Sequence, residues 1–190
     1  MTFTRWFARA AVSPGVVVQA GGPVRSRIDK MKKKEGGKMR IDYRNVFPAA
    51  IGAMAGLEEA VGTSTLEPEL LELVKLRASQ LNGCGYCVDM HTKDATALGV
   101  DPQRLHLAVA WTEAPCYSER ERAALAWCEA LTLLPGSDIP DDLYDEVRSH
   151  FDEEEVVALT LAVVAINGWN RFAVGLRSPV GSYQPPDGHQ

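Results

Sequence analysis

The sequence has few cysteines, no recognisable secretory signal and no apolar run long enough to span a membrane. Its 190 residues include four cysteines, too few for a scaffold of this length held together by disulfides. No N-terminal stretch combines a charged start, an apolar run and a small-residue cleavage site. The most apolar run, residues 156–166, is too short to span a bilayer. These absences indicate a cytoplasmic protein with no membrane partner, in which closely spaced thiols are usually catalytic or metal-binding.

Charge is distributed unevenly along the chain. Residues 1–38 contain nine Lys and Arg and two Asp and Glu, whereas residues 39–190 contain eleven and twenty-three, a net charge of −12. An acidic body argues against nucleic acid as a partner.

The basic segment 1–38 has no sustained periodicity, and we expect it to be a disordered extension. It could be a transit peptide, a basic arm, or no part of the working protein. The residues before Met39, Lys-Glu-Gly-Gly-Lys, can be encoded by a purine-rich ribosome-binding sequence. If the source is bacterial, we hypothesise that Met39 is the true start, which the mass of the native protein would test.

The rest of the chain has the apolar spacing of helices and no convincing alternation of period two. Ser118 and Glu121 form a capping-box pattern, and Asn82-Gly83 is a helix stop and turn. We predict an all-α bundle of six or seven helices in residues 39–180, followed by a flexible tail, 181–190. The expected helices cover about 48–61, 68–82, 84–98, a stretch from 101, a stretch from 118, 140–150 and 152–176.

The stretch NGCGYCVDMH, residues 82–91, concentrates the reactive side chains. On a helix beginning near Cys84, the side chains of Cys84, Cys87 and His91 share one face. The backbone N–H groups at a helix N-terminus favour a negative charge, which lowers the pKa of a thiol there. His91, one turn beyond Cys87, is close enough to exchange a proton with it.

Glu72 is the candidate partner of His91. If Asn82-Gly83 makes a tight helical hairpin, Glu72 lies roughly 15 Å before the turn and His91 roughly 10 Å after it, so the two nearly face each other. Ser79 falls on the same helix face as Glu72. A carboxylate in this place could orient the imidazole and receive a proton through it.

Other interpretations stay open for several polar side chains. Cys84, Cys87 and His91 could supply three zinc ligands, but a fourth would have to be His106 or Cys116, since the chain has no second CxxC. Cys116 and Cys128 are most simply small apolar fillers. Residues 167, 170 and 171 place polar side chains on a very apolar helix, where such groups need hydrogen-bond partners. The partners could lie across a subunit boundary or near the cysteines, and we favour the subunit boundary.

The segment ELVKLRASQLNGCGYCVDMHTKDATALGV resembles the core motif of the AhpD-like alkylhydroperoxidases of the carboxymuconolactone decarboxylase superfamily. The family pattern is a Glu twelve residues before the first Cys, then CxxC, then a His four residues after the second Cys. All four positions match, and the similarity covers most of residues 40–177. The residue before the second Cys is His in AhpD but Tyr86 here, and Tyr is not a base near neutral pH.

The resemblance implies a thiol-dependent hydroperoxide reductase without cofactor or metal. Cys87 would be the peroxidatic thiolate, and Cys84, nearer the surface, the resolving cysteine that an external dithiol attacks. His91 and Glu72 would form the proton relay, with Tyr86 and Ser79 as possible supporting residues.

The resemblance also implies partners and competing functions. The reductant would be a lipoyl group or a thioredoxin-like protein, and the chain would form a dimer, trimer or hexamer. A disulfide oxidoreductase, a redox sensor without turnover and, less favoured, a lactone decarboxylase are the alternatives.

Overall fold

The computed structural model describes residues 38–136 and 138–185, all within the unit Gly37–Gln190. The regular structure in these residues is helical, which confirms the predicted fold class. The α-helices are α2 (Tyr43–Val46), α3 (Pro48–Gly62), α4 (Pro68–Leu81), α5 (Gly85–Ala97), α6 (Pro102–Leu107), α7 (Glu119–Thr132), α8 (Asp141–His150) and α9 (Glu153–Leu176), with short 3₁₀ helices at Ala108–Ala110 and Leu134–Gly136.

Seven of these helices lie where the sequence predicts them, and α2 was missed. A four-residue helix spans little more than one turn, too short for an apolar period to appear. The helix expected from residue 101 is shorter than its apolar run suggests, because α6 ends at Leu107 and a 3₁₀ turn follows. The predicted extension 1–38 lies outside the described residues except for Lys38, as do the last five residues of the predicted tail.

Local sequence signals begin several of the helices. The predicted capping box at Ser118 and Glu121 is formed, and Asp152 and Glu155 make a second one at the start of α9. Pro48, Pro68 and Pro102 each occupy the first turn of a helix, where the missing N–H has no helical partner to lose.

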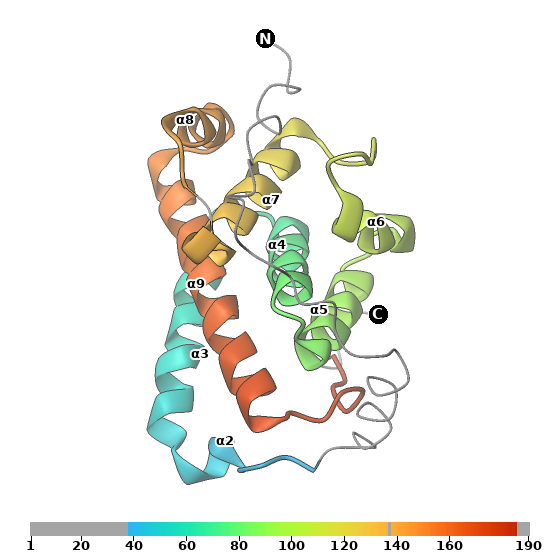
Figure 1. Ribbon diagram of the computed structural model, residues 1–190, viewed down its shortest axis with the longest axis vertical. Coiled ribbons are helices and arrows are strands. Elements are labelled where there is room, and N and C mark those ends of the chain that lie inside the picture. Colours follow the sequence, from blue (N-terminus) through green and yellow to red (C-terminus); the bar gives the residue numbers. More distant parts are fainter. Residues whose placement is uncertain (1–37, 137, 186–190) are drawn as a thin grey trace, which may run out of the picture. The chain divides into compact units, whose positions relative to one another are not determined.

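Helix α4 lies at the centre of the bundle and contacts α5, α7 and α9 (Figure 1). Its residues Leu73, Val74 and Leu76 are at most 1% exposed. Burial of each such side chain contributes about 1.5–3 kcal/mol, so α4 supplies a large part of the core. Because α4 is fixed by this burial, its side chains that point away from the core also have fixed positions relative to the neighbouring helices.

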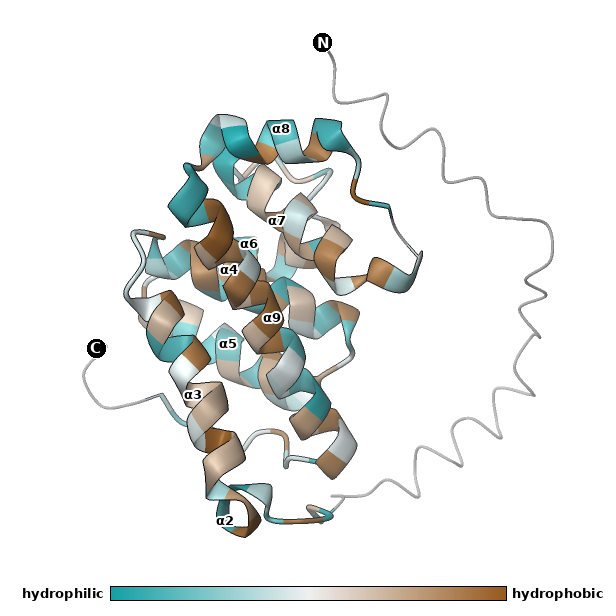
Figure 2. Ribbon diagram, turned by 90° about the vertical axis from the view of Figure 1, so that its left-hand side faces the viewer, coloured by the Kyte–Doolittle hydropathy of each residue, from teal (hydrophilic) through white to brown (hydrophobic). Residues whose placement is uncertain are grey.

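Helix α9 is long and apolar enough, with a mean hydropathy of 1.4, to cross a membrane by length and composition alone. Half of that stretch is buried against other helices, as expected for the core helix of a bundle. Figure 2 shows the contrast between apolar stretches on α4 and α9 and the mostly hydrophilic α8.

The turn between α4 and α5 places the two cysteines. Gly83 has a φ of +64°, and Asn82 is the last residue before it. The Gly83 N–H donates to the Gln80 carbonyl and the Cys84 N–H donates to the Ser79 carbonyl, which together form a Schellman motif. Cys84 closes this motif and is also the N-cap of α5. The two helices are therefore antiparallel neighbours, and Cys84 takes part both in the end of α4 and in the start of α5.

Replacing Gly83 should cost stability through the backbone alone. A Cβ at Gly83 would meet no atom within 4 Å, so Gly83→Ala should lower the free energy of unfolding by about 1–2 kcal/mol because of its positive φ. Gly62→Ala is the control, because Gly62 also has open space around it but lies inside the last turn of α3. It should leave stability unchanged or raise it by up to about 1 kcal/mol in urea denaturation. Equal effects of the two changes would contradict this account of the turn.

Candidate active site

The two cysteines of the CxxC motif are joined by a disulfide, with Cα atoms 5.4 Å apart. Cys84 is the N-cap of α5, and its sulfur accepts a hydrogen bond from the Cys87 N–H at 3.3 Å. The partial positive charge of the helix N-terminus thus acts on this pair. Cys116 and Cys128 are free, the first exposed and the second buried.

His91 and Glu72 meet across the α4–α5 hairpin, as the sequence predicts. His91 Nδ1 lies 2.8 Å from Glu72 Oε2, and the His91 side chain is 5% exposed. Burial alone would raise the pKa of Glu72, but the hydrogen bond and charge of His91, together with Lys75, outweigh it and lower the pKa. Glu72 is therefore a carboxylate, and it accepts a hydrogen bond from the Nδ1–H group. In the described part of the chain, the other ring nitrogen, Nε2, is buried without a hydrogen-bond partner.

Lys75 supplies the positive charge beside Glu72. Its Nζ lies 3.6 Å from Glu72 Oε1 and 2.9 Å from Glu58 Oε2. Burial alone would lower the pKa of Lys75, but the two carboxylates raise it. The ammonium group is therefore charged at neutral pH and favours the ionised form of Glu72.

Cys87 and His91 line one cavity of about 470 Å³. A volume of this size admits a small organic molecule. Four aromatic side chains and one thioether make much of the wall apolar, while Glu72 and Asp94 lie close to His91 and Lys75 lies beside Glu72. The lining residues are Tyr43, Arg44, Glu58, Glu72, Lys75, Tyr86, Cys87, Met90, His91, Asp94, Trp169, Ala173 and Tyr183.

One expectation about the cysteines is wrong. Cys84 does not lie nearer the surface than Cys87, because their exposed fractions are 1% and 2%. Cys87 lines the cavity and Cys84 does not. Both cysteines belong to the buried core cluster, so burial does not distinguish them, whereas the cavity does.

The two possible supporting residues lie in different surroundings. Tyr86 lines the cavity, whereas Ser79 is fully buried and does not. The Ser79 hydroxyl donates to the Lys75 carbonyl at 2.7 Å and accepts from Asn170 Nδ2 at 3.2 Å. Ser79 thus holds the end of α4 rather than the reacting groups.

The polar residues of α9 find partners within the same chain, which corrects our preference for a subunit boundary. Asn82 Nδ2 donates to the side-chain oxygens of Asn167 and Asn170, at 3.0 and 2.8 Å. Arg171 donates to the Asn167 carbonyl at 2.6 Å. This cluster links α9 to Asn82, the C-cap of α4, which lies two positions before Cys84. The polar side chains therefore have their partners near the cysteines, the other of the two expected locations.

Sequence reasoning missed nine of the thirteen residues that line the cavity, and three of the nine, Lys75, Asp94 and Tyr183, bear on the Glu72–His91 pair. Lys75 and Asp94 each lie three residues from a predicted site residue on the same helix, a spacing that could have identified them. Tyr183 lies in the segment expected to be a flexible tail, yet its hydroxyl donates to Asp94 Oδ1 at 2.7 Å. No local signal connects a tyrosine so late in the chain with α5.

Glu72, His91 and Asp94 could also offer three atoms to a metal ion, all within 4.8 Å of one another. The Lys75 ammonium beside Glu72 opposes a cation there. The expected zinc alternative at the cysteines used Cys84 and Cys87, whose sulfurs are here bonded to each other.

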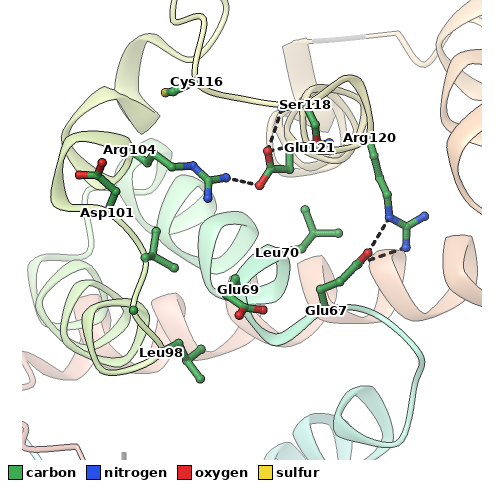
Figure 3. A pocket seen from close by; sticks show the side chains of 12 residues that line it. Glu67, Glu69, Leu70, Leu98, Asp101, Arg104, Cys116, Ser118, Arg120 and Glu121 are labelled. Atoms are coloured by element: carbon green, nitrogen blue, oxygen red, sulfur yellow. Dashed lines mark hydrogen bonds and ion pairs between the residues drawn. The ribbon is translucent and has the colours of Figure 1, made fainter. Parts of the chain in front are cut away.

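A second cleft, of about 650 Å³, opens between α4, α6 and α7 (Figure 3). Cys116 lines it, but its two arginines are already paired with carboxylates: Arg104 with Glu121, and Arg120 with Glu67. It shares no lining residue with the cysteine cavity. Of these two cavities, the first one brings Cys87, the imidazole of His91 and open space together.

Comparisons with known proteins agree with this fold and motif. The model of the carboxymuconolactone decarboxylase family matches residues 48–130, which contain Glu72, both motif cysteines and His91. The uncharacterized protein YdfG of Bacillus subtilis (strain 168) is 40% identical over 143 residues, or 75% of this chain and 97% of the relative.

Two solved structures show the same architecture. A protein of unknown function from Agrobacterium tumefaciens, with a suggested role as the antioxidant defence protein AhpD, superposes with a TM-score of 0.74 at 44% identity, over 77% of this chain and 100% of the other. The debrominase Bmp8 superposes with a TM-score of 0.65 at 24% identity, over 71% and 73%. The chain belongs to the carboxymuconolactone decarboxylase family and has an AhpD-like fold, which confirms the resemblance.

Replacing Glu72 should remove a pH-dependent part of the stability. Because the folded-state pKa of Glu72 is lowered, its contribution to stability is fully present above the ordinary pKa of 4.5 that it has in the unfolded chain, and is lost as the pH falls through the folded-state pKa. Glu72→Gln should therefore lower the free energy of unfolding by about 1–3 kcal/mol at pH 7, and this deficit should shrink in acid.

Urea denaturation from pH 7 down to pH 3 measures this deficit. Glu69→Gln, in the exposed first turn of the same helix, is the control and should change stability by about 0.5 kcal/mol or less. A deficit that stays constant with pH would show that the Glu72 charge is not the stabilising feature.

Proposed function

We propose that the protein is a thiol-dependent hydroperoxide reductase whose CxxC pair cycles between dithiol and disulfide. The observation that carries the proposal is that Cys87 lines the same cavity as His91, whose Nδ1 is held by the Glu72 carboxylate. A nucleophile, a base oriented by a third group and room for a substrate are the parts that such a reaction needs.

Access assigns the peroxidatic role to Cys87. The N-cap position favours the thiolate of Cys84 electrostatically, but a substrate in the cavity meets only the sulfur of Cys87. His91 is one helical turn from Cys87, and because its Nδ1–H donates a hydrogen bond to Glu72, its Nε2 is free to take the thiol proton.

The first step breaks the O–O bond of the hydroperoxide. The Cys87 thiolate attacks one oxygen and becomes a sulfenic acid, while the other oxygen leaves as an alkoxide and receives the proton held by His91. The Cys84 thiolate, favoured by its N-cap position, then attacks the sulfenic sulfur and releases hydroxide, which takes a proton to become water. The product is the Cys84–Cys87 disulfide that the structure contains.

A dithiol restores the reduced pair by thiol–disulfide exchange. A lipoyl group or a thioredoxin-like protein is the expected source. Because both sulfurs are buried and Cys87 faces the cavity, a slender dithiol would reach Cys87 first, rather than Cys84 as the resemblance implies. Such a cycle suits the cytoplasm, where reduced dithiols are available.

The cavity leaves Tyr86 in a limited role. It occupies the position of a histidine in AhpD, lines the cavity and can donate a hydrogen bond without acting as a base. The relay is then His91 and Glu72 alone.

Thiol counting tests the proposal directly. One equivalent of an organic hydroperoxide should remove two thiols per reduced chain and leave a Cys84–Cys87 bridge, and dithiothreitol should sustain turnover. Cys87→Ser should abolish turnover. Cys84→Ser should stop the cycle at a sulfenic acid on Cys87, which dimedone traps. Cys116→Ser, which removes the exposed free thiol, is the control and should turn over normally.

Other outcomes would replace the proposal with a named alternative. Exchange with protein or lipoyl disulfides without peroxide consumption indicates a disulfide oxidoreductase. A single oxidation that changes assembly without turnover indicates a redox sensor. Release of carbon dioxide from a lactone substrate without thiol oxidation indicates a decarboxylase.

We also propose that the chain forms a homo-oligomer. Five large apolar side chains are at least half exposed and leave apolar surface for a second copy. They are Val46 and Phe47, at the junction of α2 and α3, and Val157, Val164 and Val174 along α9. Light scattering should give a mass of two, three or six chains. Val164→Asp should lower that mass, while Val109→Asp, an exposed site in the 3₁₀ turn after α6, should not. A monomeric parent protein would refute the assembly.

A further inference from the structure

The segment that follows α9 returns to the cavity and contacts α5. Tyr183 lines the cavity, its hydroxyl donates to Asp94 Oδ1 at 2.7 Å, and its carbonyl accepts from Lys93 Nζ at 2.8 Å. Two neighbouring residues of α5 thus hold one tyrosine by its side chain and its backbone. These two hydrogen bonds fix both the side chain and the backbone of Tyr183 on α5.

Asp94 is the second carboxyl group beside His91. Single oxygen atoms of Glu72 and Asp94 and a ring nitrogen of His91 all lie within 4.8 Å of one another. Glu72 is bonded to His91 Nδ1, whereas the contact described for Asp94 is with the Tyr183 hydroxyl. At such distances a negative charge on Asp94 stabilises a protonated His91 by Coulomb attraction.

We propose that Tyr183 is a positioning residue of the active site, which acts through Asp94 on His91. Its hydroxyl holds the Asp94 carboxylate beside the imidazole and favours the charged form of that carboxylate. The charge in turn supports the imidazolium that forms when His91 takes the proton of Cys87. The inference rests on the proposed function, but it concerns the ionisation of Cys87 and can be measured without any peroxide.

The surrounding charges define the direction of the effect. Asp94 is faced by titratable groups from three elements: Glu72 and Lys75 of α4, His91 of α5, and Tyr183 of the final segment. Burial raises the pKa of Asp94, and the charge of Glu72 raises it further, while the Tyr183 hydrogen bond, His91 and Lys75 lower it. Without the hydroxyl the pKa of Asp94 rises further, Asp94 loses its charge at a higher pH, and the imidazolium–thiolate pair becomes less stable there.

Alkylation of Cys87 by iodoacetamide, followed against pH, reports its thiolate fraction. The experiment uses the full reduced chain with Cys84→Ser and Cys116→Ser, which leaves Cys87 and the buried Cys128. Burial raises the pKa of Cys128 to about 12, so it stays unreactive. Tyr183→Phe keeps the ring and removes only the hydroxyl.

Tyr183→Phe should move the alkylation profile to higher pH, with a rate about three- to tenfold lower below its midpoint. Asp94→Asn should move it in the same direction. In the double variant, Tyr183→Phe should add no further shift to Asp94→Asn, because the hydroxyl acts only through that carboxylate. Ser182→Ala, whose hydroxyl bonds the Pro179 carbonyl in the same segment, should leave the profile unchanged.

Three results would overturn the proposal: an unchanged profile for Tyr183→Phe, additive shifts in the double variant, or an equal shift for Ser182→Ala. Each would mean that Tyr183 only covers the cavity or stabilises the fold. Peroxide turnover is measured separately, so a protein that shows the predicted profiles but consumes no peroxide would retain this inference and lose the proposed function.

Discussion

The hydrogen bond between Glu72 and His91 is the interaction on which the site depends. It joins two antiparallel helices through side chains 19 residues apart in the sequence, at 2.8 Å. Lys75 keeps Glu72 ionised, and the ionised carboxylate holds the Nδ1 proton of His91. This leaves Nε2 as the basic nitrogen of a buried imidazole one turn from Cys87. Without the bond, His91 would be a buried imidazole with no hydrogen-bond partner for either ring nitrogen among the described residues, which is costly.

The backbone at residues 82–84 makes that bond possible. A Schellman motif reverses the chain at Gly83, and its last residue, Cys84, begins the next helix. The turn is held from the far side by Asn82, which donates to Asn167 and Asn170 of α9. The packing of α4 in the core then determines how far the Glu72 side chain lies below the protein surface. The chemistry at the cysteines is therefore a consequence of how one hairpin is packed.

Local sequence signals were sufficient for seven of the eight α-helices in the described residues and for the Glu72–His91 pair. Helical period, capping boxes and the Asn82-Gly83 turn act within a few residues, and the spacing from the turn placed Glu72 opposite His91. Properties that depend on tertiary packing were not accessible in this way. The relative burial of Cys84 and Cys87, the partners of Asn167 and Asn170, and the return of Tyr183 to Asp94 each require knowing how α9 and the segment after it lie on the hairpin.

The protonation state of His91 in the reduced protein tests the central claim most directly. Nitrogen-15 chemical shifts of its ring, assigned by comparison with His91→Asn, distinguish the two neutral tautomers. The account predicts a proton on Nδ1 and none on Nε2 above the pH at which the ring loses its charge, with the preference lost in Glu72→Leu. A proton on Nε2 in the parent protein, or the same tautomer without the carboxylate, would contradict it.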